Sequence, residues 1–311
     1  MMTTITTNMM NLSSSINDTT FPDVAESLAV MMQKERTVYT RRDYLSNIRA
    51  AVSSSIGIGL QKANLLDKED RAKMVDWCYC VVDMCQLDRE TVAVAMDMVD
   101  RFLSSSNNSK KSIVVAMDVL GDRIQFQLLT LTALYISIKI SSNLVLGSNF
   151  FSVISRDLYT LQEIEAMELV LLKELAWCIS PPTCVQISYH IVSLISTQVT
   201  FDKNAWAAIL DEVDHQAEHA VRHYDFVTQR PSTVAMAAIF NALGRFDKHE
   251  SQGILSAVLS IMNTAEFESI EVILATRSKL HSLVYGHEST GDDWDVEECD
   301  AAVDETDQWY L

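Results

Sequence analysis

Proline is missing from a long central stretch of the chain, between Pro22 and Pro181. All 311 residues together contain 4 Pro and 8 Gly, about 4% where roughly 12% is usual. These residues form the turns of β-sandwiches and the Gly-rich loops of phosphate-binding folds, so such folds are hard to build from this sequence. Long helices with short connections need neither residue. The sequence therefore predicts an all-α protein.

The net charge of the chain limits the partners that it can bind. Lys and Arg number 24 against 42 Asp and Glu, a net charge of −18, so the protein's own field opposes a surface that tracks nucleic-acid phosphates. Residues 288–311 hold ten acids and no Lys or Arg. We therefore expect no nucleic-acid partner. We also expect an acidic disordered tail over 287–311 and a Thr-, Asn- and Ser-rich disordered arm over 1–20.

Several signals of export or membrane insertion are missing from the sequence. The first twenty residues have no Lys, Arg or apolar run, and no segment reaches the ~20 apolar residues that span a bilayer. Three of the six cysteines fall within one helical pattern and the others are scattered singly, which favours reduced thiols. We expect an intracellular protein with no membrane partner.

Helical periodicity predicts two groups of five helices on either side of Pro181-Pro182. The first group covers 71–86, 88–103, 126–140, 149–155 and 161–177, and the second covers 183–196, 206–226, 232–246, 252–262 and 266–285. We expect an N-terminal extension over 21–60 that packs on the first core, a first unit over 61–179 and a second over 180–286. The similar order of elements indicates a structural duplication.

No catalytic signature is present: the sequence has no Gly-rich phosphate loop, GxSxG, HExxH or paired CxxC. His215, His219 and His223 share a spacing of four residues, so their rings could approach one another and ligate a metal. The buried stripe of that helix points elsewhere, which favours a solvated polar face. We expect no enzyme activity, cofactor or metal.

Two charges interrupt apolar helices. Glu168 lies within the apolar stripe of 161–177, and Lys139 lies near the end of the otherwise apolar 126–140. A lone charge in an apolar setting is costly, so both need a partner. They form either an internal ion pair or contacts to another protein, and periodicity alone favours neither. For Arg71 and Asp100 we expect a buried bridge between two helices.

Three segments of the first unit resemble cyclins, in register with one another. Residues 71–77 (RAKMVDW) are similar to the family's MRAILVDW, 99–105 (VDRFLSS) to YIDRFLSS, and 132–139 (TALYISIK) to TAAMLLASK. Residues 167–175 and Pro182-Thr183 fit MEHLVLKVL and APT without a gap.

The likeness continues into the second unit, where 230–235 (RPSTVA) resembles the start of the third helix of a second cyclin box. The resemblance extends to about residue 285. It implies two tandem five-helix cyclin boxes with an N-terminal helical extension and an acidic tail.

The resemblance assigns roles to the hallmark residues, all of which are present: Arg71, Asp100, Leu128, Lys139 and Glu168. In cyclins, Lys139 and Glu168 would bind main-chain groups beside the regulatory helix of a cyclin-dependent kinase. The other three would be structural.

The resemblance also implies an apolar groove that cushions the kinase helix, formed by Ile136, Ile140, Leu172, Trp177 and Ile179. The protein would then activate a cyclin-dependent kinase allosterically, in cell-cycle control, without chemistry of its own. Kinase substrates or inhibitors would be further partners, and the nucleus and cytoplasm its location. The alternative is a cyclin-fold scaffold of the general transcription type that binds DNA or basal factors, which predicts a basic face.

The chain also departs from the family. Ile140-Ser141-Ser142 replaces the acidic pair that usually follows the lysine. In the substrate-docking patch of many cyclins, this chain has Asp70 and Lys73 at apolar positions, so only a weakened patch of Met74 and Trp77 remains. Residues 42–45 (RDYL) have the RxxL form of a degradation box.

Overall fold

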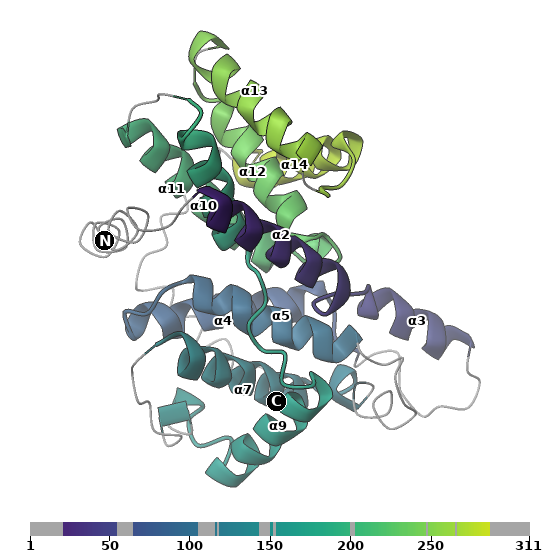
Figure 1. The fold of residues 1–311 in the computed structure, drawn as a ribbon. Helices are drawn as coiled ribbons and strands as arrows, with labels where there is room; N and C mark the ends of the chain where they lie inside the picture. Colours follow the sequence, from purple (N-terminus) through teal and green to yellow (C-terminus); the bar gives the residue numbers. More distant parts are fainter. Residues whose placement is uncertain are drawn as a thin grey trace.

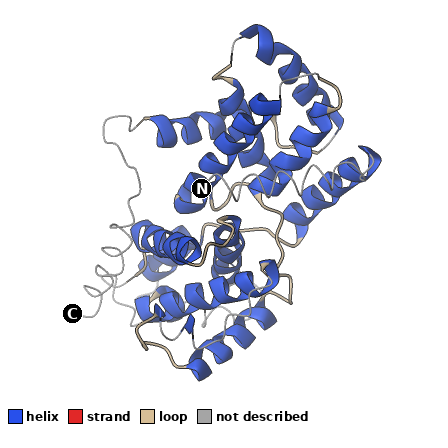
Figure 2. Ribbon diagram, turned by 90° about the vertical axis from the view of Figure 1, so that its left-hand side faces the viewer, coloured by secondary structure: helices blue, strands red, loops and turns tan. Residues whose placement is uncertain are grey.

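The computed structural model describes residues 21–54, 65–104, 116, 118–142, 150–151, 154–199, 203–246, 248–264 and 266–286. The described residues contain helices and no strand, so the all-α class is confirmed (Figure 2). The predicted arm, the acidic tail and part of the 149–155 helix lie outside the described residues, although residues 150, 151 and 154 are helical.

The helices fall into two bundles, which Figure 1 shows one above the other. The first contains α4 (Lys68–Met84), α5 (Glu90–Ser104), α7 (Arg123–Ser141) and α9 (Leu161–Glu174). The second contains α10 (Cys184–Ser196), α11 (Lys203–Arg222), a 3₁₀ turn η2 (Tyr224–Phe226), α12 (Pro231–Leu243), α13 (Lys248–Thr264) and α14 (Ile270–Tyr285). Two further helices, α2 (Phe21–Thr37) and α3 (Tyr44–Ser54), precede both.

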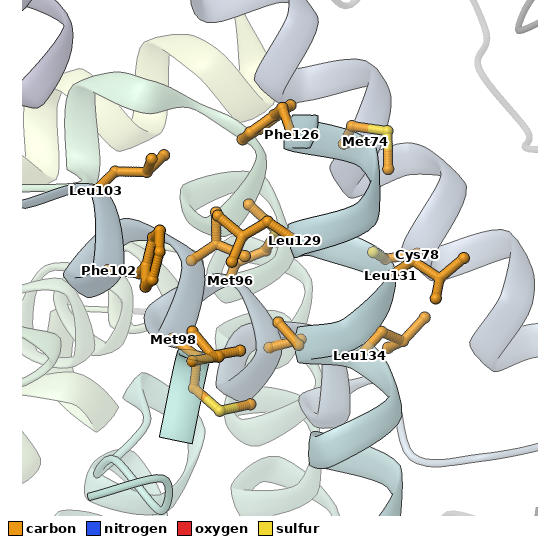
Figure 3. Close-up of a cluster of buried hydrophobic side chains, with 14 of the residues drawn as sticks. Met74, Cys78, Met96, Met98, Phe102, Leu103, Phe126, Leu129, Leu131 and Leu134 are labelled. Atoms are coloured by element: carbon orange, nitrogen blue, oxygen red, sulfur yellow. The ribbon is translucent and has the colours of Figure 1, made fainter. Parts of the chain in front are cut away.

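Each bundle is built around one helix that is apolar or small on nearly every side. In the first bundle this helix is α7, which packs against α5 and α9 through side chains such as Leu129, Leu131 and Leu134 (Figure 3). In the second bundle it is α12, where every residue from Ser232 to Leu243 is buried. A helix surrounded by other helices has no polar face, and the α7 and α12 segments both show this pattern.

Within the described residues, only α7 is long and apolar enough to cross a membrane by length and composition. Of its most apolar window, 67% is buried inside the protein, as expected for the central helix of a bundle.

Side chains fix where several helices begin. Asp67 and Asp70 form a capping box at the start of α4, and Thr160 and Glu163 form another at the start of α9. The α12 helix has no cap from its own chain neighbours. Glu35 of α2 supplies it by accepting hydrogen bonds from the backbone and hydroxyl of Ser232, so the N-terminal segment completes a helix almost 200 residues away.

The placement of the N-terminal extension corrects the sequence prediction. Leu28 and Met32 of α2 belong to the second core, and α2 packs along α10. Only α3 joins the first core, through Tyr44, Leu45 and Ile48. The extension therefore spans both bundles rather than packing on the first alone, because an amphipathic pattern predicts a buried face but not the surface that buries it.

Three smaller predictions were also wrong. The helix predicted over 206–226 ends at Arg222 and is followed by the η2 turn. The last helix begins at Ile270 rather than at residue 266, and residues 118–120, for which no helix was predicted, are helical. These differences are at helix ends and connections, where periodicity is weakest.

Polar contacts join the two bundles. The Arg222 guanidinium on α11 donates to both carboxylate oxygens of Asp76 on α4, at 2.7 and 2.9 Å. Arg89, at the start of α5, binds Glu218 of α11 through two hydrogen bonds of 2.8 and 2.9 Å. Such bidentate pairs fix orientation as well as contact, so they define how one bundle is turned against the other.

Candidate functional site

The two charges that interrupt apolar helices lie together at the surface of the first bundle. The Lys139 ammonium, near the end of α7, donates to the Glu168 carboxylate of α9 at 2.6 Å. The Lys139 side chain is 44% exposed and that of Glu168 is 17% exposed. The free chain therefore forms an ion pair between them, and solvent still reaches it.

The electrostatic setting keeps Lys139 charged. Burial alone would lower the pKa of Lys139, but the hydrogen bond and negative charge of Glu168 outweigh that effect. The ammonium also lies 4.6 Å from the centre of the Tyr135 ring, a cation–π geometry. The net result is a raised pKa for Lys139.

Three exposed apolar side chains follow the two charges along the chain. Ile140 follows Lys139 on α7 and is 45% exposed, Leu169 follows Glu168 on α9 and is 47% exposed, and Trp177 after α9 is 64% exposed. We call these five residues the α7–α9 surface. Leu169 was not predicted as a site residue, because the prediction for that helix rested on its buried stripe; an apolar residue outside the stripe was the available signal.

The other residues predicted to cushion a partner helix are placed differently. Ile136 is 2% exposed and Leu172 is 8% exposed, so in this structure both lie beneath the surface and support it. Ile179 is half-buried against the first core. Both Ile136 and Leu172 belong to the protein's own core, and their contact with a partner helix stays a prediction.

A left-handed turn places Trp177 on the surface. The sequence predicts that the helix runs to residue 177, but α9 ends at Glu174 and Ala176 and Trp177 adopt φ of 50° and 63°. The Trp177 amide still donates to the Leu172 carbonyl at 2.9 Å. Residues other than Gly rarely adopt this conformation, so the surrounding structure must hold it.

Arg71 and Asp100 form a buried bridge with both side chains under 5% exposed. The Arg71 guanidinium donates to both Asp100 oxygens at 2.9 and 2.7 Å and to the Val221 carbonyl of α11 at 2.7 Å. Tyr44 adds a hydrogen bond to Asp100. The bridge thus joins α4, α5, α3 and the second bundle. Leu128 is 6% exposed in the first core.

Residues at the predicted substrate-docking patch are paired or buried to different extents. Asp70 accepts two hydrogen bonds from the Arg123 guanidinium, at 3.1 and 3.2 Å. Met74 is 4% exposed and Trp77 is partly buried against the core. Asp70 is thus paired within the chain and Met74 is buried, while the weakened patch of Met74 and Trp77 stays a prediction.

The RxxL segment is folded into the protein. Tyr44 and Leu45 are 4% and 3% exposed, and the Leu45 amide donates to the Tyr224 hydroxyl of the second bundle. A linear degradation signal must be reached in an extended form, so this segment would have to leave its site first.

Two of the three histidines lie close together. His215 and His219 approach to 3.3 Å between their Nε2 atoms, but the described residues include no group of three ligands that could hold a metal ion. Burial first, and then His215 and His223, lower the pKa of His219 to about 4.

Comparison with known proteins identifies a family. The protein-family model described as "Cyclin, N-terminal domain" matches residues 26–180. G1/S-specific cyclin-E1 of Mus musculus is 29% identical over 156 residues, which is 50% of this chain and 32% of that protein. Cyclin-B1-1 of Oryza sativa subsp. japonica is 28% identical over 182 residues, 57% of this chain and 36% of that protein. The match spans about a third of the length of these curated relatives.

Solved structures show the same fold. A viral cyclin from herpesvirus saimiri superposes with a TM-score of 0.50 at 12% identity and covers 78% of this chain and 99% of that one. A chain of the CAK complex from Chaetomium thermophilum bound to ATP-gamma-S gives a TM-score of 0.51 at 14% identity and covers 90% of this chain and 83% of that one.

The two tandem helical bundles and the matches to known proteins define a protein of the cyclin fold. The chain belongs to the cyclin family.

Proposed function

We propose that this cyclin is a non-catalytic regulatory subunit that binds a cyclin-dependent kinase and activates it allosterically in cell-cycle control. The observation that carries the proposal is the solvent-reached Lys139–Glu168 pair amid the exposed apolar side chains of the α7–α9 surface. Relatives named as G1/S-specific and G2/mitotic-specific cyclins support the cell-cycle role. The nucleus and cytoplasm are the compartments we propose for it.

The surface suits an amphipathic helix at the edge of a kinase lobe. Ile140, Leu169 and Trp177 supply apolar anchors, which a helix recognises through residues spaced three or four apart. Lys139 and Glu168 would exchange their mutual hydrogen bond for main-chain groups of the partner. Because the pair is already partly solvated, opening it costs about 1 kcal/mol or less.

Activation follows from differential affinity. If this surface binds only the kinase conformation in which the regulatory helix is rotated inward, binding shifts the kinase population toward that conformation. A change from 1:99 to 99:1 needs about 5.5 kcal/mol of differential affinity. No reacting group is required of the cyclin itself.

The test is co-purification with cyclin-dependent kinases of the source organism, followed by a kinase assay. The variant Lys139→Ala/Glu168→Ala should stay folded but lose kinase activation. The matched control is Arg230→Ala/Glu268→Ala, which removes a pair of similar exposure, 35% and 33%, from the second bundle. An active complex from the first variant at an unchanged concentration dependence would overturn the assignment. Salt-dependent DNA binding without a kinase would support the transcription-type scaffold instead.

A further inference from the structure

One buried arginine holds the turn that carries Trp177. The Arg101 side chain on α5 is 5% exposed and donates to the Cys178 carbonyl at 2.6 Å. Its Nε donates to Asp97 one helical turn earlier at 2.6 Å. Asp97 thus fixes the guanidinium plane, and the guanidinium fixes the backbone at the residue that follows Trp177.

The N-terminal extension covers the same arginine. The Tyr39 ring, 8% exposed, lies with its centre 4.6 Å from the Arg101 guanidinium carbon. Burial raises the pKa of the Tyr39 phenol, against the opposing effects of Arg101 and of a hydrogen bond with the Ser180 backbone. Tyr39 therefore lies against the arginine that binds the turn.

Arg41 ties this cluster to the second bundle. Its guanidinium donates to the Gln229 carbonyl, in the loop before α12, at 2.9 Å and lies 3.5 Å from Asp97. Arg41 thus links the second bundle to Asp97, the carboxylate that orients Arg101. Such a clamp is what the left-handed backbone at Ala176 and Trp177 requires, because that conformation persists only when its surroundings over-determine it.

We propose that Arg101 is a positioning residue for partner binding: together with Tyr39 of the N-terminal extension, it holds the 176–180 turn so that Trp177 projects from the α7–α9 surface. The inference rests on the proposed function, because Trp177 is useful only if that surface docks a kinase. Arg101 itself is buried and touches no partner. Loosening the clamp should weaken binding without changing the activity of the complex once it has formed.

The experiment uses the full chain and three variants. Arg101→Lys keeps the positive charge but loses the planar fork, Tyr39→Phe removes only the hydroxyl, and Arg222→Lys is the control that perturbs a bidentate pair away from the turn. Each variant is also made with Trp177→Phe, so that the difference isolates Trp177 fluorescence from that of the other four tryptophans. Acrylamide quenching, thermal unfolding and kinase activation are then measured.

We expect Arg101→Lys to increase the quenching of Trp177 and to raise the half-saturating cyclin concentration about tenfold, with maximal kinase activity unchanged within about twofold. Tyr39→Phe should act in the same direction, about threefold. Arg222→Lys should leave Trp177 quenching unchanged. If Arg101→Lys fails to fold, Tyr39→Phe carries the test.

The proposal is overturned if folded Arg101→Lys and Tyr39→Phe show unchanged Trp177 quenching and unchanged half-saturation. A parallel fall in maximal activity and affinity would also overturn it, because it would indicate a general structural role. If the wild-type chain activates no kinase, the proposed function fails, yet the quenching comparison still decides whether Arg101 positions Trp177.

Discussion

The two bundles differ at the C-terminal ends of their central helices, α7 and α12. In the first, α7 ends beside α9 with the solvent-reached Lys139–Glu168 pair and exposed apolar neighbours. In the second, α12 ends beside α14 with Asn241, which is 3% exposed. Its amide donates to Gln216 at 2.8 Å and accepts from Arg277 at 3.1 Å. The end of α7 is thus reached by solvent, and we call it the open end. The end of α12 is held by hydrogen bonds within the chain, and we call it the sealed end.

The difference shows what separates a docking surface from a structural one. At the sealed end, Asn241 is hydrogen-bonded to Gln216 and Arg277 within the chain, as buried polar groups usually are. At the open end, Lys139 pairs with Glu168 and lies over the Tyr135 ring, and neighbouring apolar side chains remain in contact with water. The two bundles therefore differ in how this helix end is paired, although the second bundle also exposes apolar side chains such as Leu255 and Leu274.

The largest effect on stability is expected from disrupting the hydrogen bonds of Asn241 at the sealed end. Asn241→Leu keeps the approximate size of the side chain but leaves Gln216 and Arg277 without their partner, so the free energy of unfolding should fall by about 3 kcal/mol. Urea denaturation measures it, with the exposed Asn204→Leu on α11 as the control. Kinase activation by the folded variant should be normal. A loss below about 1 kcal/mol would show that water replaces the network.

The next largest effect, on kinase binding, is expected from removing the exposed aromatic side chain of Trp177. Trp177→Ala should weaken kinase binding by about 2 kcal/mol, or about thirtyfold, because aromatic anchors carry much of the binding energy of an interface. Stability should hardly change, since the side chain is 64% exposed. Calorimetric titration against the kinase measures it. If Leu274→Ala on α14, which is also exposed, weakens binding as much, the contrast between the bundles is lost.

A pH-dependent effect should arise where the bundles meet. Burial first, and then the charges of Asp211, Glu90, Asp88 and Glu218, raise the pKa of Asp214 to about 7. A raised carboxyl pKa means that the folded state holds a proton that the unfolded state has released. The contribution of Asp214 to stability therefore declines as pH rises from about 4 to about 7.

Asp214→Asn should remove this decline and gain about 2 kcal/mol in the free energy of unfolding at pH 8, with little gain at pH 4. His219, whose pKa is lowered to about 4, has the opposite slope between about 4 and 6.5. The difference between variant and wild type, measured by denaturation across pH, isolates Asp214. A gain that is independent of pH would contradict the assignment.

The smallest effect on stability is expected from removing the charge of Glu168 at the open end. Glu168→Gln should change the free energy of unfolding of the free chain by about 0.5 kcal/mol or less, because Lys139 is 44% exposed and exposed ion pairs stabilise little. Thermal unfolding at two salt concentrations measures it. A loss comparable to that of Asn241→Leu would mean that the open end is structural after all.

Much of the fold was predictable because helices are local. The apolar spacing of α4, α5 and α7 follows from 3.6 residues per turn, and the predicted ranges lie within a few residues of the observed ones. Glu168 was identifiable as a charge in an apolar stripe for the same reason. The end of α9 was not, because the left-handed turn at Trp177 depends on Arg101, which lies about 75 residues earlier in the chain.

The sequence by itself determined the helices, the small-residue centres of both bundles and the two charges that have no place in an apolar stripe. These properties depend on chain geometry and side-chain polarity, which act over one or two turns. Only the tertiary structure decided that α2 packs on the second core, that Ile136 is covered while Ile140 is exposed, and that Asp70 is paired with Arg123. Such choices depend on which distant surfaces meet, and a periodic pattern carries no information about its partner.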